Sequence, residues 1–255
     1  MATSKGFCAN AFENVAHTNA LQANLVRVGW GAWLTQNNTQ YGNLRVVIDL
    51  SDIDPSFPLT VPNLQLVAVQ LHYCGKFLIG NEPYLNGYTP QQFADAVIPI
   101  MDLVQSVDPN ALFGIAAGIN IPKGSFPYAP VWYEADSWWN AMFQLLPARH
   151  RKNAAIALHA YHNADVSLID FLRQSNEYRN ANYANKQLWL SEVGRANTSG
   201  AAQYNPANIH AKCVTHNFRW WAWYAQQPIA TAANYMCLQN TDGTLTQYGQ
   251  DFLTI

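Results

Sequence analysis

Two glutamates occur in the same setting, each at the end of a short apolar run. Glu82 ends KFLIGNE and Glu192 ends QLWLSE, in a chain that has five glutamates in all. Two carboxyl groups that face one cleft are what cleavage of a glycosidic bond requires, because one protonates the leaving oxygen while the other attacks the anomeric carbon or activates a water. The pair therefore predicts glycoside hydrolysis, provided that the fold brings the two runs together.

The whole chain has a rhythm that would bring them together. Short apolar runs alternate with segments long enough for a helix, and the last five runs begin at residues 76, 111, 154, 187 and 230, which lie 33 to 43 residues apart. Continuous apolar runs are typical of parallel strands that are covered on both faces. The eight runs are 6–12, 24–30, 44–50, 76–82, 111–119, 154–161, 187–194 and 230–238.

Eight such units predict an α/β protein with a single (β/α)8 TIM barrel over residues 1–255, whose first half is compact. The carboxyl ends of the strands of such a barrel meet at one mouth, where catalytic side chains lie. Glu82 and Glu192, at the ends of the fourth and seventh strands, would then face one cleft.

The segments between the runs predict helices. Residues 89–107 begin with Thr89 as an N-cap and Pro90 in the first turn, and their apolar residues follow helical spacing. Residues 136–150 and 211–227 have the same character, and the second segment would place its tryptophans, 220, 221 and 223, on an outer helix.

The composition argues against several classes of partner and cofactor. The 255 residues are 49% hydrophobic and 12% charged, the net charge is −2, and only 14 residues are Lys or Arg, which disfavours a nucleic-acid face. No run reaches the 18 or so apolar residues of a membrane span, and no glycine-rich phosphate loop follows a strand. The histidines of HAYH lack the spacing of a helical zinc pair, so we expect neither a metal nor another cofactor.

The cysteines and the first residues bear on the compartment. Cys8, Cys74, Cys213 and Cys237 are widely spaced; sequence leaves three complete pairings open, and we favour buried free thiols. The first residues show no apolar core of a signal peptide. The low charge and the polysaccharide-type site nevertheless favour a secreted protein, outside the cell or in a periplasm. We also expect a monomer.

A family resemblance rests on several of these motifs together. IGNEP, followed 110 residues later by WLSEVG, resembles glycoside hydrolase clan A, the retaining (β/α)8 glycosidases. LHAY resembles the His-x-Tyr that ends strand six in the cellulase and mannanase family of that clan, and VRVGW resembles its arginine segment on strand two. The resemblance extends from about Leu25 to Phe252, and the small β-1,3-glucanases of the clan are an equally close comparison.

The resemblance implies a role for each matching residue. Glu82 would be the acid/base, Glu192 the nucleophile, and Asn81 the residue that binds the 2-hydroxyl of the sugar. Arg27 would hold Glu192 ionised through its positive charge, and the alternative is a surface-paired arginine.

Two further residues of the sixth run fit the same resemblance. Tyr161 would hydrogen-bond the nucleophile, and His159 would orient the acid/base or the substrate. Their alternation with Leu158 and Ala160 places both on one side of a strand. The alternative is a buried pair that satisfies its own hydrogen bonds.

Aromatic residues are the remaining candidates for contact with sugar. Trp30 and Trp33 follow the second run and would either stack on sugar rings or pack in the core. The cellulase family has a histidine after strand three where this chain has Ser51, and a tryptophan on strand eight where we consider Asn234 and Tyr235, of which Tyr235 is our candidate for substrate contact.

The motifs together predict a retaining glycoside hydrolase that cleaves β-linked polysaccharide, in the first place an endo-β-glucanase with a two-glutamate double-displacement mechanism. The alternatives are a transglycosylase of the same clan, which passes the sugar to another sugar instead of water, and a barrel that binds carbohydrate without cleaving it. The substrate in each case is a poly- or oligosaccharide.

Overall fold

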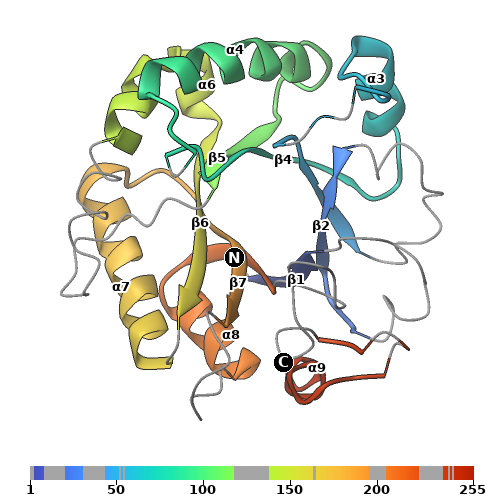
Figure 1. Ribbon diagram of the computed structural model, residues 1–255, viewed down its shortest axis with the longest axis vertical. Helices are drawn as coiled ribbons and strands as arrows, with labels where there is room; N and C mark the ends of the chain where they lie inside the picture. Colours follow the sequence, from blue (N-terminus) through green and yellow to red (C-terminus); the bar gives the residue numbers. More distant parts are fainter. Residues whose placement is uncertain are drawn as a thin grey trace.

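Eight parallel strands close into a barrel, and the helices lie outside it (Figure 1). The computed structural model describes residues 3–8, 21–30, 44–51, 53, 55–84, 86–117, 138–162, 165–195, 205–223, 238–240, 242 and 244–255. The strands are β1 (Ser4–Cys8), β2 (Leu25–Gly29), β3 (Arg45–Asp49), β4 (Tyr73–Asn81), β5 (Leu112–Ala117), β6 (Ala154–His162), β7 (Leu188–Arg195) and β8 (Phe218–Trp223). Each strand pairs with the next in sequence and β8 pairs with β1, which confirms the (β/α)8 barrel.

The barrel is filled by one apolar layer. Its members are Cys8, Leu25, Val47, Leu78, Ala155, Ala157, Trp189, Trp220 and Ala222. The indoles of Trp189 and Trp220 lie 5.3 Å apart between their centroids and take up much of the space. Gly114 of β5 makes room for them, since a Cβ at this position would lie 2.4 Å from the ring of Trp189. Large side chains on β7 and β8 thus require a small one on β5.

The other face of strands β2 to β8 packs against the helices in a second, larger core. The described helices are α3 (Val61–Ala68), α4 (Pro90–Val107), α6 (Ala148–Lys152), α7 (Asp165–Asn182), α8 (Pro206–Thr215) and α9 (Gln247–Leu253). The helix expected after Thr89 is confirmed as α4, and Thr89 and Gln92 form a capping box at its start. None of the described helices is long and apolar enough to cross a membrane.

The last third of the barrel differs from what the sequence led us to expect. The helix expected over 211–227 ends at Thr215, and Asn217 turns the chain with φ of 59° into β8. The eighth strand is therefore Phe218–Trp223 and not 230–238, because the aromatic run FRWWAW fits a buried strand. Trp223 points outward onto Tyr248 of α9, at 5.2 Å between ring centroids.

Two smaller expectations can also be compared with the structure. The helix expected over 136–150 is interrupted, because Pro147 separates residues 138–145 from α6. Cys8 and Cys213 are buried free thiols, as expected, Cys74 is a free thiol that is only partly buried, and Cys237 lies outside the described residues.

Gly80 near the end of β4 gives the first testable prediction. Its φ is 82°, and a Cβ would lie 2.3 Å from the ring of Phe93 in α4. A left-handed alanine costs about 1–2 kcal/mol and overpacking about 1–3 kcal/mol. We therefore expect Gly80→Ala to lower the free energy of unfolding by about 3 kcal/mol, measured by urea denaturation.

Two other glycines serve as matched controls. Gly87 also has a positive φ, of 78°, and Gly29 does not, and a Cβ at either would meet nothing within 4 Å. Gly87→Ala should cost about 1 kcal/mol and Gly29→Ala about 0–0.5 kcal/mol. Equal losses for Gly80→Ala and Gly87→Ala would show that the Phe93 ring moves aside without cost.

Candidate active site

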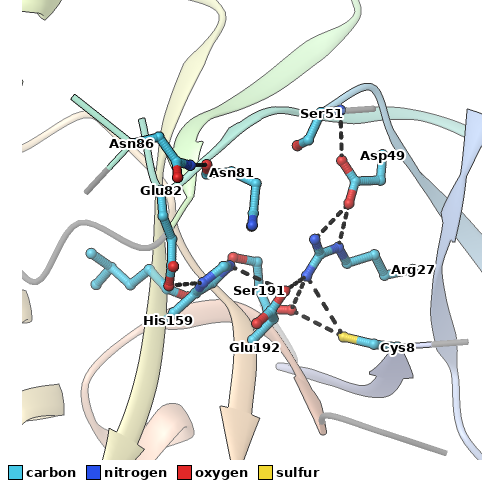
Figure 2. A network of polar contacts seen from close by, with 11 residues as sticks. Cys8, Arg27, Asp49, Ser51, Asn81, Glu82, Asn86, His159, Ser191 and Glu192 are labelled. Atoms are coloured by element: carbon cyan, nitrogen blue, oxygen red, sulfur yellow. Dashed lines mark hydrogen bonds and ion pairs between the residues drawn. The ribbon is translucent and has the colours of Figure 1, made fainter. Parts of the chain in front are cut away.

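A polar layer lies directly above the apolar layer, toward the carboxyl ends of the strands (Figure 2). Each of three polar residues follows a member of the apolar layer by two positions, and therefore points to the same inward side of its strand. The pairs are Leu25 and Arg27 in β2, Val47 and Asp49 in β3, and Ala157 and His159 in β6. The alternation that builds the core thus also delivers charged groups to the mouth of the barrel.

Glu192 reaches this layer by a different route. Between Leu190 and Val193, β7 has two residues where β6 and β8 each have one, so the strand has a β-bulge at Ser191 and Glu192. Trp189 points inward, and strict alternation would therefore turn Glu192 outward to the helices. The extra residue turns the carboxylate into the barrel.

Ser191 fastens the bulge to β6 beside it and to β1 and β2 across the barrel. Its hydroxyl donates to the carbonyl of Leu158 at 3.1 Å. Its carbonyl accepts from the thiol of Cys8 at 3.3 Å and from Nη1 of Arg27 at 3.4 Å. Both polar groups of this buried residue are thereby satisfied, which makes the irregular backbone tolerable in the interior.

The guanidinium of Arg27 lies between two carboxylates. Its Nε and Nη2 donate to Oδ2 of Asp49 at 2.9 Å and 2.5 Å, and its Nη1 donates to Oε1 of Glu192. Burial alone would lower the pKa of Arg27, but the two carboxylates outweigh it and raise the pKa above its ordinary value. Arg27 therefore stays charged, and it pairs inside the barrel and not on the surface.

Asp49 is held as an anion by the same contacts. Burial would raise the pKa of Asp49, but the Arg27 guanidinium and the hydrogen bonds from Ser51 and Arg27 lower it below its ordinary value. The backbone N–H of Ser51 donates to Oδ1 at 2.9 Å, which leaves Oδ2 for Arg27. Ser51, which follows β3, thus fixes the orientation of the Asp49 carboxylate.

The imidazole of His159 lies between the two glutamates. Nδ1 is 3.1 Å from Oε1 of Glu82, and Nε2 is 3.4 Å from Oε1 of Glu192. The His159 side chain is 3% exposed. One buried ring in contact with both carboxyl groups shows that the ends of β4 and β7 do converge, as the spacing of the two motifs predicts.

Glu82 approaches the imidazole through an unusual backbone conformation. Its φ is 47°, in the left-handed region that non-glycine residues seldom adopt. The turn is closed by Asn86, whose N–H donates to the carbonyl of Glu82 at 3.1 Å and whose Nδ2 donates to the carbonyl of Asn81 at 3.0 Å. The side chain of Asn81 points toward the middle of the group in Figure 2.

The two glutamates have different surroundings. The Glu192 side chain is 11% exposed and pairs with Arg27, while the Glu82 side chain is 33% exposed and has no Arg or Lys partner among the described residues. A charged carboxylate is favoured beside a buried guanidinium. The two carboxyl groups thus differ in burial and in their charged partner.

The aromatic residues expected to contact sugar are Trp30, Trp33 and Tyr235, and Trp30 does not line the site. Trp30 is fully buried in the outer core with Val26 and Val28, and its indole donates to the carbonyl of Phe57 at 2.9 Å. Trp30 is thus a packing residue. Trp33 and Tyr235 lie outside the described residues.

Tyr161 is described only in its backbone, which pairs with Gly194 of β7 in the ladder between β6 and β7. The sequence analysis missed Asp49 and Cys8, although Asp49 follows the apolar run VVI just as Glu192 follows WLS. Among the residues that the structure describes, no group of three or more His, Cys, Asp or Glu side chains could hold a metal ion.

The buried Asp49 gives a prediction about acid stability. Its pKa is lower in the folded chain than the ordinary 3.8, so its ionised form stabilises the fold above about pH 4 and this contribution is lost as the pH falls through the folded pKa. We expect Asp49→Asn to cost about 3 kcal/mol at pH 7, the low end for breaking a buried pair, because Glu192 still pairs with Arg27.

Urea denaturation of wild type and variant at pH 7 and at pH 3 measures this difference, which should shrink at the lower pH. Asp170→Asn is the control, since Asp170 pairs with Arg173 on the surface at 3.4 Å and its side chain is 48% exposed. Its loss should cost less than about 1 kcal/mol. A difference for Asp49→Asn that stays constant between the two pH values would contradict the prediction.

Comparison with known proteins gives a likeness in fold. No protein-family model and no curated protein matches the sequence. A GH128 (subgroup I) endo-β-1,3-glucanase from Amycolatopsis mediterranei, solved with laminaripentaose, is 20% identical with a TM-score of 0.65 and 99% of each chain covered. A GH128 (subgroup II) endo-β-1,3-glucanase from Sorangium cellulosum is 15% identical, with a TM-score of 0.64 and 98% of each chain covered.

A more distant enzyme shares the same architecture. The exo-β-1,4-mannosidase of an Opitutaceae bacterium is 13% identical with a TM-score of 0.63, over 99% of this chain and 59% of the mannosidase. At these identities the likeness concerns the fold. The chain thus has the (β/α)8 barrel of the clan A glycosidases that its motifs resemble.

Proposed function

We propose that this protein is a retaining glycoside hydrolase that cleaves β-glucan within the chain, with Glu82 as acid/base and Glu192 as nucleophile. The observation that carries the proposal is the contact of one buried imidazole, His159, with both carboxyl groups, only one of which pairs with Arg27. Two carboxyl groups with different charge at one barrel mouth are what double displacement requires.

In the proposed resting state a neutral imidazole donates from one nitrogen and accepts at the other. Nε2–H would face the ionised Glu192, 3.4 Å away, and Nδ1 would accept the proton of the carboxyl group of Glu82. This assignment places the proton on Glu82 and the negative charge on Glu192 before the substrate reacts.

In the first step the carboxylate of Glu192 attacks the anomeric carbon, and the bond to the leaving oxygen breaks as Glu82 gives that oxygen its proton. The product is a glycosyl ester of Glu192 and a shortened glucan. In the second step Glu82, now ionised, removes a proton from water, and the water attacks the anomeric carbon and releases Glu192. Two inversions restore the original configuration.

The substrate class is proposed from the likeness to the GH128 enzymes. Those from Amycolatopsis mediterranei and Sorangium cellulosum are named endo-β-1,3-glucanases, and the first was solved with laminaripentaose. A β-1,3-glucan is therefore the first substrate to test. Asn81 would bind the 2-hydroxyl of the sugar whose bond is cleaved, from its position next to Glu82, and Tyr161 would hydrogen-bond Glu192.

Replacement of each glutamate tests the proposal. We expect Glu192→Gln and Glu82→Gln each to lower the release of reducing sugar from laminarin by about 10³-fold or more, because each removes a group that takes part in bond making or breaking. Glu177→Gln is the control, since Glu177 lies on α7 and pairs with Arg173 with a side chain that is 60% exposed. It should leave the rate unchanged.

A substrate with a good leaving group separates the two roles. A nitrophenyl glucoside needs little help from an acid, so Glu82→Gln should still release a burst of nitrophenol while Glu192→Gln should not. Proton NMR of the first product would show the retained β-anomer. A first product of inverted configuration would overturn the mechanism.

The same assay separates the alternatives. Longer oligosaccharides formed from laminarihexaose would indicate transglycosylation by the same two residues. Binding of laminarihexaose in calorimetry with no cleavage by the wild type, across β-1,3-, β-1,4- and mixed-linkage glucans, mannan, xylan and galactan, would leave a barrel that binds carbohydrate without cleaving it.

His159 gives a further prediction. We expect His159→Ala to lower kcat by about 10²-fold, because both glutamates lose a common neighbour that fixes their positions. His210→Ala is the control. His210 accepts a hydrogen bond from the indole of Trp221 at 3.1 Å, on the outer, helix-covered side of β8. If kcat for laminarin is unchanged in His159→Ala, the imidazole does not position the glutamates.

A further inference from the structure

We propose that Asp49 is a positioning residue for the reaction proposed above, on which this inference rests. It holds two of the three donor nitrogens of Arg27, so that a single nitrogen reaches Glu192. Glu192 then stays ionised without losing the basicity that attack on the sugar requires.

The geometry of Arg27 supports this division. Nε and Nη2 both donate to Oδ2 of Asp49, at 2.9 Å and 2.5 Å, and Nη1 alone donates to Glu192. A guanidinium fork with free donors prefers to bind a carboxylate through two parallel hydrogen bonds. Without Asp49, the guanidinium of Arg27 would be free to rotate and bind both oxygens of Glu192. Glu192 would then be displaced from the position in which it can attack the anomeric carbon.

The orientation of Asp49 is itself fixed. The backbone N–H of Ser51 donates to its Oδ1 at 2.9 Å, and the Asp49 side chain is 15% exposed. Asp49 therefore presents one oxygen to Arg27 in a direction that β3 and the residues after it determine. Asp49 and Glu192 both accept hydrogen bonds from Arg27, so the influence of Asp49 on Glu192 passes through this guanidinium.

The charges around Glu192 support the same role for Asp49. Among the described side chains, the titratable groups joined to Glu192 directly or through one shared partner include Cys8, Arg27, Asp49, Glu82 and His159. Burial raises the pKa of Cys8 to about 12, since the nearby Arg27 offsets only part of it, and the thiol is neutral at ordinary pH. Two carboxylates thus share one guanidinium, and the negative charge of Asp49 weakens the electrostatic attraction between Arg27 and Glu192.

The test is the pH profile of laminarin hydrolysis by Asp49→Asn. We expect kcat to fall by about 10- to 100-fold and the acidic limb of kcat/KM to move to lower pH, because Arg27 then favours the ionised form of Glu192 without opposition. KM should change by less than about 3-fold, since Asp49 does not touch the substrate. Asp49→Glu restores the charge, and the acidic limb should return toward that of wild type.

The matched control is Asp108→Asn. Asp108 accepts from the hydroxyl of Tyr73 at 2.6 Å where β4 begins and α4 ends, at the opposite end of the barrel. It should leave the pH profile in place. A fall in kcat with an unmoved acidic limb in Asp49→Asn would reduce Asp49 to a structural role and overturn the proposal.

A measurement that needs no activity separates this inference from the proposed function. Carbon NMR of the labelled carboxyl group of Glu192 follows its titration in wild type and in Asp49→Asn, and a shift of the midpoint to lower pH is expected. That shift in a protein that cleaves no glucan would overturn the proposed function and leave the coupling of Asp49 to Glu192 standing. An unshifted midpoint would overturn the coupling whether or not the wild type is active.

Discussion

A buried guanidinium shared by two carboxylates is the constraint on which the mouth of this barrel depends. The Arg27 side chain is 10% exposed, and a charge taken out of water is costly unless charged and polar partners surround it. Those partners come from β1, β3 and β7, as Cys8, Asp49, Ser191 and Glu192. The strands must therefore keep a fixed register, since a slip of one residue would turn a partner to the other face.

The register is set by the apolar layer beneath. Trp189 and Trp220 fill the interior, and Gly114 leaves the space that their rings require. Two positions further along β2, β3 and β6 the inward side chains are Arg27, Asp49 and His159. The same packing therefore stabilises the barrel and aligns its polar layer. Loss of this packing would disorder the polar layer.

Much of this could be predicted from the sequence, where pattern and geometry agree. The apolar runs before Glu82 and Glu192 predicted β4 and β7 and the convergence of their carboxyl ends, although β7 continues past Glu192 to Arg195. The eighth strand was misplaced because FRWWAW continues the apolar pattern of α8, and the turn at Asn217 has no glycine or proline to mark it. Asp49 could have been found by the rule that found the glutamates, but the β-bulge of β7 could not, because pairing with β6 and β8 creates it.

Both glutamates reach His159 through an irregular backbone. Glu192 turns inward only because β7 carries an extra residue, and Glu82 turns inward at a left-handed φ of 47°. Regular strands would direct alternate side chains to a packed interior or to the helices, and neither direction would bring two acids to one imidazole. Such irregularities cost free energy, and they persist where the surrounding contacts determine them, here through Ser191 and Asn86. The positions that a regular pattern explains least are therefore the positions to which we assign the chemistry.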